Sequence, residues 1–100
     1  KYDAELKNTI QWIIPNAQKN MMEPILLTLE AGGSTWPDNP HEGEEFGYVL
    51  SGSIQIQLGD RVVRARKGES FYFRSDEPHK IINPGKNTAK FIWVATPPSF

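Results

Sequence analysis

The chain has 100 residues, 11 basic and 12 acidic side chains, a formal net charge of −1 and no cysteine. A chain of this length makes one domain, the balanced charge offers no basic surface for a phosphate backbone, and the lack of cysteine excludes disulfides and thiolate metal sites. No apolar run approaches a membrane span and no signal-peptide pattern opens the chain, so we expect a cytoplasmic domain that neither contacts a membrane nor binds DNA directly.

Strand-like segments alternate with turn residues along the whole chain. Residues 1–8 are expected to be a linker or lead-in, and residues 9–100 the domain. The expected strands are, in chain order, Thr9–Ile14, Ile25–Glu30, Phe46–Leu50, Ser53–Leu58, Arg61–Arg66, Phe71–Phe73, His79–Ile82 and Ala89–Ala95. The loop 32–40 holds two glycines and two prolines and cannot be a helix. Short strands at such regular spacing predict an all-β sandwich or barrel.

Both histidines lie beside strands that carry acidic or amide groups. In an extended strand Glu45 shares a face with Gly47 and Val49, and His79 shares one with Ile81 and Asn83. If both faces are interior, Glu45 and His79 converge, and His41, just before its strand, reaches the same point. Two imidazoles and one carboxylate suit ferrous oxygenase chemistry and also zinc.

Two other readings of these residues stay open. The same groups could line a metal-free pocket that binds an organic ligand. Alternatively, His79 could bond to backbone while Glu42, Glu44 and Glu45 form a solvated acidic edge.

The two segments resemble the signature motifs of the cupins. The first motif falls on Asn39, His41, Glu45 and Gly52, with Asn39 in place of the usual first histidine. The second falls on Gly68, His79 and Asn83, with Arg74 and Asp76 in place of its proline and second glycine. The resemblance implies a small cupin-type double-stranded β-helix, or jelly-roll, barrel.

The same resemblance implies the site. A single divalent ion, with Zn, Fe, Mn and Ni left open, would be held by His41, Glu45 and His79. Because Asn39 is at most a weak oxygen ligand, metal binding is expected to be weak or absent. The residues expected to bind an organic ligand are Trp36, Asn39, Glu45, His79 and Asn83, with Trp36 as a lid.

Within the cupins the chain is most similar to C-terminal sensor domains of bacterial Cro/repressor-type helix-turn-helix regulators. The matching segments are Glu44–Gly52, Gly68–Phe73, Pro78-His79, Asn83–Gly85 and Val94–Phe100. The likeness implies a small-molecule effector, a homodimer, and DNA contact only through an N-terminal domain absent from this chain; a start at Lys1 fits a piece of such a protein. The alternatives are a free-standing metal-dependent enzyme, a dioxygenase or isomerase, and a storage or scaffold protein with an empty barrel.

The aromatic residues predict both a core and an outer surface. Most of a set of nine is expected in the core: Trp12, Trp36, Phe46, Tyr48, Phe71, Tyr72, Phe73, Phe91 and Trp93. Phe46, Tyr48 and Leu50, however, alternate with Glu45 and must point to the opposite side of their strand. An apolar stripe of that kind is typical of an association surface, which agrees with a homodimer.

Overall fold

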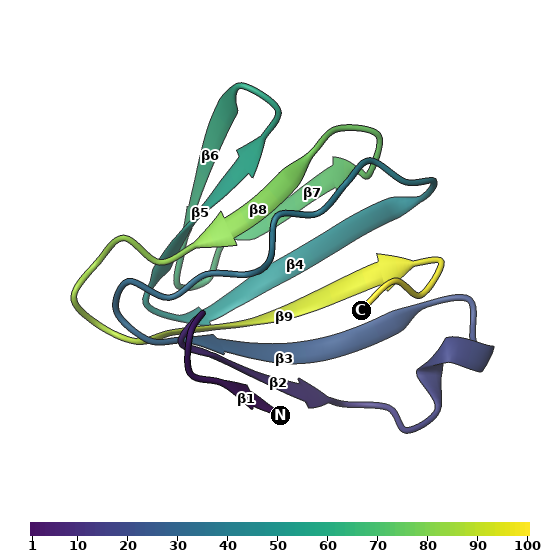
Figure 1. Cartoon of the computed structure of the whole chain (residues 1–100), viewed down its shortest axis with the longest axis horizontal. Coiled ribbons are helices and arrows are strands. Elements are labelled where there is room, and N and C mark those ends of the chain that lie inside the picture. Colours follow the sequence, from purple (N-terminus) through teal and green to yellow (C-terminus); the bar gives the residue numbers. More distant parts are fainter.

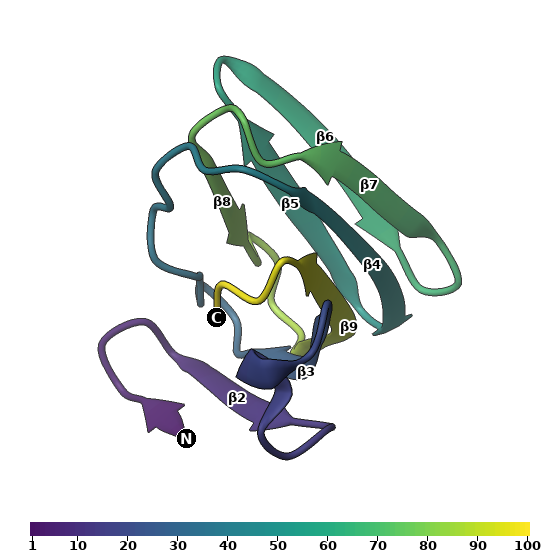
Figure 2. The same ribbon diagram turned by 90° about the vertical axis from the view of Figure 1, so that its right-hand side faces the viewer.

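The computed structural model describes residues 1–100 and contains nine β-strands in two antiparallel sheets. The strands are β1 Tyr2–Asp3, β2 Asn8–Trp12, β3 Glu23–Leu29, β4 Glu44–Ser51, β5 Ser53–Leu58, β6 Arg61–Arg66, β7 Ser70–Arg74, β8 His79–Ile82 and β9 Ala89–Thr96. The large sheet has the order β1-β2-β3-β9-β4-β7 and the small sheet β6-β5-β8. The two sheets enclose one apolar core (Figures 1 and 2), which confirms the predicted all-β class.

Three of the eight predicted strands have the ends that the structure shows. β5, β6 and β8 have the predicted ends, whereas β4 begins two residues earlier than predicted, at Glu44. β2 stops at Trp12, so Ile13 and Ile14 lie outside it. In the expected lead-in, Tyr2–Asp3 forms a short strand paired with β2. Beyond the strands there is only a short 3₁₀ turn, and no helix is long and apolar enough to cross a membrane.

β4 shows why alternate residues divide between the core and the surface. Glu45, Gly47 and Val49 are buried, whereas the residues between them are exposed. A glycine is needed at position 47 because the ring of Phe71, on the neighbouring strand, occupies the space of a side chain: a Cβ atom there would lie 2.0 Å from Phe71 Cζ. The inward direction of Glu45 therefore follows from the strand geometry.

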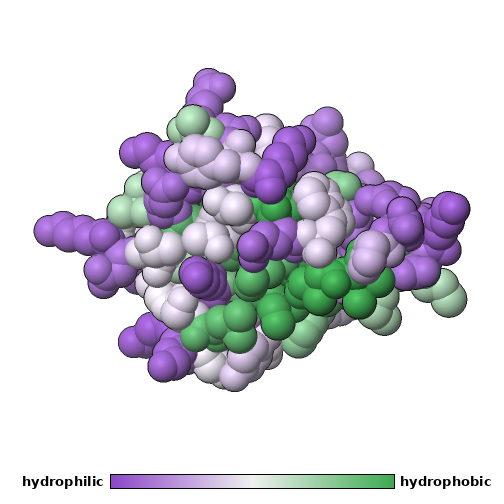
Figure 3. All heavy atoms as spheres, turned by 90° about the horizontal axis from the view of Figure 1, so that it is seen from below, coloured by the Kyte–Doolittle hydropathy of each residue, from purple (hydrophilic) through white to green (hydrophobic).

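The core holds fewer aromatic side chains than the sequence analysis expected. Four of the nine are buried, Phe71, Phe73, Phe91 and Trp93. The other five are Trp12, Trp36, Phe46, Tyr48 and Tyr72, which are 38 to 59% exposed. The expectation that most are core is wrong because a strand buries only one of its faces. Figure 3, which shows the molecule from below, has a band of apolar side chains across that face.

The loop between β3 and β4 completes the wall beside β8. Ser34 pairs with Ile82, and Asp38 pairs with His79, in isolated antiparallel bridges. The Asp38 N–H donates to the His79 carbonyl at 2.8 Å, and the His79 N–H donates back at 3.1 Å. As Figure 1 shows, this loop runs alongside β8 before the chain enters β4. The predicted non-helical loop is thus confirmed, and it is held in a fixed position by these bonds.

A buried carboxylate fixes the C-terminal tail. Glu23, on β3, is fully buried, and its Oε2 accepts hydrogen bonds from Trp12 Nε1 at 2.7 Å and Gln18 Nε2 at 2.9 Å. Its Oε1 accepts one from the backbone N–H of Phe100 at 2.8 Å. The Phe100 ring then lies 4.6 Å from the Trp93 ring, centre to centre. This contact places the tail at the edge of the core.

Candidate metal centre and adjoining cavity

Glu45 and His79 come from opposite sheets and meet between them. Glu45 lies on the inner face of β4, and His79 is the first residue of β8; their side chains are 1% and 0% exposed. His79 Nε2 lies 3.0 Å from Glu45 Oε2. The convergence of these two side chains, predicted from strand alternation, is present in the structure.

The loop before β4 adds Asp38 and His41 to this pair. His41 Nε2 lies 3.4 Å from Glu45 Oε2 and 3.4 Å from Asp38 Oδ2, and His79 Nε2 lies 3.1 Å from the same Asp38 atom. The backbone N–H of His41 donates to the Ser75 carbonyl at 2.7 Å, and this bond holds the His41 backbone in place beside the cluster. One ligand atom from each of the four residues lies within 4.8 Å of the others.

Three polar atoms of this four-residue cluster are buried and have no hydrogen-bond partner. They are His41 Nε2, His79 Nε2 and Glu45 Oε1. Buried polar atoms are nearly always paired, so three unpaired atoms in one place require an explanation. A cation between the two Nε2 atoms and the Glu45 carboxylate would satisfy both imidazole nitrogens.

The far side of each imidazole is oriented by backbone. Nδ1 of His79 lies 2.9 Å from the Glu77 carbonyl, and Nδ1 of His41 lies 3.2 Å from the Glu42 carbonyl. Because a carbonyl only accepts, each Nδ1 carries the proton, and in the neutral ring Nε2 presents a lone pair to the cluster. Ser75 Oγ donates to Glu45 Oε2 at 2.8 Å and orients that carboxylate.

Without a metal, the cluster favours a protonated His79. Burial lowers the pKa of His79, but the Glu45 carboxylate, the Glu77 carbonyl and the Asp38 carboxylate together outweigh it and raise the pKa to about 9. The remaining neighbours are the rings of His41, 5.2 Å away, and Phe73, 5.0 Å away. The extra proton is held by two flanking carboxylates.

This pKa shift predicts how the stability of the metal-free domain depends on pH. The pKa of His79 is raised in the folded state above an unfolded value near 6.5, so its stabilising effect is complete below about pH 6.5 and is lost as pH rises through about 9. In excess chelator, the melting temperature should fall between these two pH values. His79→Gln should flatten this part of the profile. A wild-type melting temperature constant over the range would contradict the prediction.

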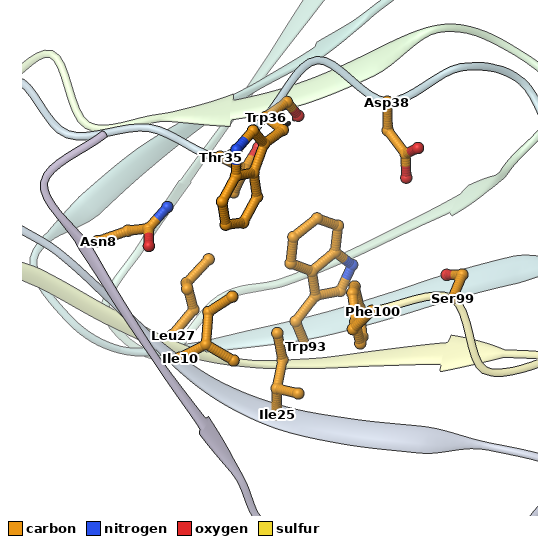
Figure 4. A pocket seen from close by; sticks show the side chains of 10 residues that line it. All are labelled: Asn8, Ile10, Ile25, Leu27, Thr35, Trp36, Asp38, Trp93, Ser99 and Phe100. Atoms are coloured by element: carbon orange, nitrogen blue, oxygen red, sulfur yellow. Dashed lines mark hydrogen bonds between the residues drawn. The ribbon is translucent and has the colours of Figure 1, made fainter. Parts of the chain in front are cut away.

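A cavity of about 160 Å³ adjoins the cluster. It lies between the large sheet, the loop before β4 and the C-terminal tail, and Figure 4 shows the ten side chains around it. Most of its wall is apolar, formed by residues such as Ile10, Leu27 and Phe100. Asp38 belongs both to the cavity wall and to the cluster. A molecule in the cavity would therefore lie next to the cluster.

Of the five residues predicted to bind an organic ligand, three lie at the cluster or the cavity and two do not. Trp36 lines the cavity and is 45% exposed. Asn39 is exposed and belongs to neither the cluster nor the cavity wall. Asn83 is buried away from the cavity, and its amide bonds to the backbone of the turn that follows β8.

Sequence reasoning missed Asp38 and Ser75. The motif position assigned to Asn39 is one residue after Asp38, and the bridge to His79 turns Asp38 inward instead. Ser75 follows β7 directly, at the place where its strand ends beside Glu45. A carboxylate next to the expected ligand position was the one available signal for Asp38.

The residues of the cluster fit a divalent cation. Two imidazole nitrogens and two carboxylate oxygens suit Zn, Fe, Mn or Ni, and backbone contacts orient both rings as in metal sites generally. With His79 protonated, one proton must leave before Nε2 can bind a metal. Metal affinity should therefore fall with decreasing pH below about 9.

Both a family model and a curated relative match most of this chain. The family model described as "Cupin domain" matches residues 25–95. The HTH-type transcriptional regulator PuuR of Escherichia coli is 29% identical over 76 residues, which are 76% of this chain and 41% of that protein. The chain thus spans about two fifths of the length of this relative.

Two solved structures share the fold. The Cupin_2 domain of an XRE family regulator from Enterobacter cloacae superimposes with a TM-score of 0.81 at 18% identity, covering 93% of this chain and 99% of that one. An HTH_3 family regulator from Vibrio cholerae gives a TM-score of 0.83 at 23% identity, covering 99% of this chain and 56% of that one. These neighbours confirm the predicted jelly-roll fold.

Proposed function

The chain belongs to the cupin domain family, and we propose that it is the effector-sensing domain of a bacterial transcriptional regulator, with a metal centre beside its ligand cavity. The single observation that carries this proposal is the cluster of Asp38, His41, Glu45 and His79, which shares Asp38 with the cavity. The similarity to regulators that carry the same domain supports the regulatory context. Such a domain would act in the cytoplasm.

Asp38, His41, Glu45 and His79 would hold a metal ion, which would supply a positive charge beside the cavity. The chain's own residues do the rest: Glu77 and Glu42 carbonyls orient the imidazoles, and Ser75 orients Glu45. The apolar cavity wall excludes water from the bound effector. An effector that binds one conformation more tightly would shift the protein towards that conformation.

Binding is favoured over catalysis by the chemistry of the cavity wall. Of the ten residues that line it, only Asp38 is titratable, and Asp38 belongs to the cluster. General acid–base catalysis, as in an isomerase, would require an acid or base next to the substrate. The alternative, a free-standing metal-dependent dioxygenase or isomerase, therefore has less support.

Two measurements test the proposal. Elemental analysis of protein purified without chelator should find one divalent ion per chain. The reading frame upstream of Lys1 should encode a helix-turn-helix segment, and the full-length protein should bind its own promoter with an affinity that small metabolites change. Turnover of oxygen or isomerisation of a substrate by this domain would instead establish the enzyme.

We also propose that the domain forms a homodimer through the outer face of the large sheet. Phe46 and Tyr48 on β4 and Tyr72 on β7 are 41 to 59% exposed, and Phe46 lies directly opposite Tyr72. Exposed apolar side chains on adjacent strands are typical of an association surface. A second copy would remove them from water.

A charge in this face should separate the dimer. Tyr48→Glu is expected to convert the dimer to a monomer in light scattering coupled to gel filtration, because a buried unpaired carboxylate is strongly unfavourable. Met21→Glu is the matched control, since Met21 is 89% exposed and lies outside the sheet. A dimeric Tyr48→Glu protein would place the interface elsewhere.

A further inference from the structure

Two buried polar atoms in the cavity wall have no partner in the protein. They are Asn8 Oδ1 and Trp93 Nε1, on residues that are 1% and 5% exposed, and both residues line the cavity. Neither belongs to the four-residue cluster. Because buried polar atoms are normally paired, two unpaired ones in the same cavity indicate the polar groups of what binds there.

The roles of the two atoms are fixed by their surroundings. Asn8 Nδ2 donates to the Ser34 carbonyl at 2.8 Å, so the amide oxygen must be the free atom and can only accept. Trp93 Nε1 can only donate. The bound molecule must therefore bring a donor to Asn8 and an acceptor to Trp93.

The two atoms lie towards different ends of the cavity. In Figure 4, Asn8 lies at one end, whereas Asp38 and Ser99 lie at the other, and the ring nitrogen of Trp93 is on the side facing Ser99. Between them the wall is formed by Ile10, Leu27 and other apolar side chains. The middle of the bound molecule is therefore apolar.

Charge and size narrow the chemistry further. Because Asn8 has no acidic residue beside it in the cavity wall, a neutral hydroxyl suits its oxygen better than an ammonium group. The opposite end adjoins the cluster through Asp38, where a carboxylate could accept from Trp93 and face the metal. A cavity of about 150 Å³ holds benzene, so the cavity of about 160 Å³ holds a molecule of similar size.

We infer that Asn8 and Trp93 determine ligand specificity, and that the effector is a short carboxylic acid with a hydroxyl group at its far end. Asn8 accepts from the hydroxyl, and Trp93 donates to the carboxylate. This inference rests on the proposed effector function and on a metal that balances the carboxylate.

Calorimetry with Zn²⁺-loaded protein tests the inference with 5-hydroxypentanoate, pentanoate and 5-aminopentanoate as probes. The hydroxy acid should bind at least about ten-fold more tightly than the other two, because each lacks a neutral hydroxyl for Asn8. This comparison uses the wild-type protein and does not depend on any variant folding. Equal affinity for the hydroxy acid and pentanoate would overturn the inference.

Variants assign each end of the ligand. Asn8→Leu should remove the preference for the hydroxy acid over pentanoate, whereas Trp93→Phe should weaken both acids about ten-fold and keep that preference. Gln11→Leu, the same kind of change at an exposed position of β2 outside the cavity, is the control and should leave the preference unchanged. If the protein holds Zn²⁺ but none of the acids binds, this inference fails and the metal centre stands; if Zn²⁺ does not bind, the proposed function fails first.

Discussion

His79→Ala should weaken metal binding at least about 100-fold. Removing a residue that only orients a metal ligand costs up to about 100-fold in affinity, so removing a ligand itself should cost at least as much. His79 is the most enclosed of the four cluster residues, and its Nε2 lies within 3.1 Å of both carboxylates. Its loss leaves one imidazole, His41, which is the more exposed of the two. Competition with a fluorescent zinc chelator measures the change.

The control for this experiment is Glu42→Gln. Glu42 is an exposed acidic residue three positions before Glu45 and lies outside the cluster. It should bind metal like the wild type, which separates a loss of ligands from a general loss of negative charge. Melting curves in chelator show that His79→Ala is folded. If folded His79→Ala retains one tightly bound ion per chain, the metal lies elsewhere.

Asn83→Ala should be strongly destabilising although the residue lies outside the apolar core. The Asn83 amide donates to the carbonyls of Leu29 and Asn87 at 3.0 and 2.8 Å and accepts from the Gly85 N–H at 3.1 Å. A third donor contact reaches the Glu30 carbonyl at 3.3 Å. Losing these bonds in a buried site should cost about 3 kcal/mol, or a fall in melting temperature of about 12 °C or more.

Asn87→Ala is the matched control in the same turn. The Asn87 side chain is exposed, and only its backbone carbonyl contacts Asn83, so its truncation should change stability by less than about 0.5 kcal/mol. Urea titrations of both variants make the comparison. We further expect the folded Asn83→Ala protein to bind small molecules like the wild type, because Asn83 does not line the cavity. Similar stability of the two variants would refute the structural role.

Local pattern was enough to predict the strands and one pair of site residues. Strict alternation in Ser53–Leu58 defined both ends of β5, because a strand buries every second residue. The same periodicity predicted that Glu45 points inward and Phe46 outward, and the structure agrees. The convergence of His79 and Glu45 could therefore be predicted from the sequence, because the inward direction of each side chain follows from the alternation of its own strand.

Contacts between distant segments could not be read from that periodicity. Asp38 lies in a loop with no repeating pattern, and it faces the cluster only because its backbone pairs with His79, which is 41 positions later. Asn83 lies one residue beyond β8 and continues the alternation that turns His79 inward, yet its amide donates to the carbonyl of Leu29, on another strand. The position of a residue in a motif does not show whether its side chain faces the cluster, as Asp38 does, or bonds to backbone, as Asn83 does.

The chain's linear pattern of apolar, polar and turn residues was sufficient for an all-β domain with Glu45 and His79 on inner faces, because strand alternation is a local property. The membership of the cluster, the cavity beside it and the unpaired atoms of Asn8 and Trp93 required the folded arrangement. These features depend on which strands and loops lie next to each other, and long-range pairing is not encoded in the spacing of any single segment.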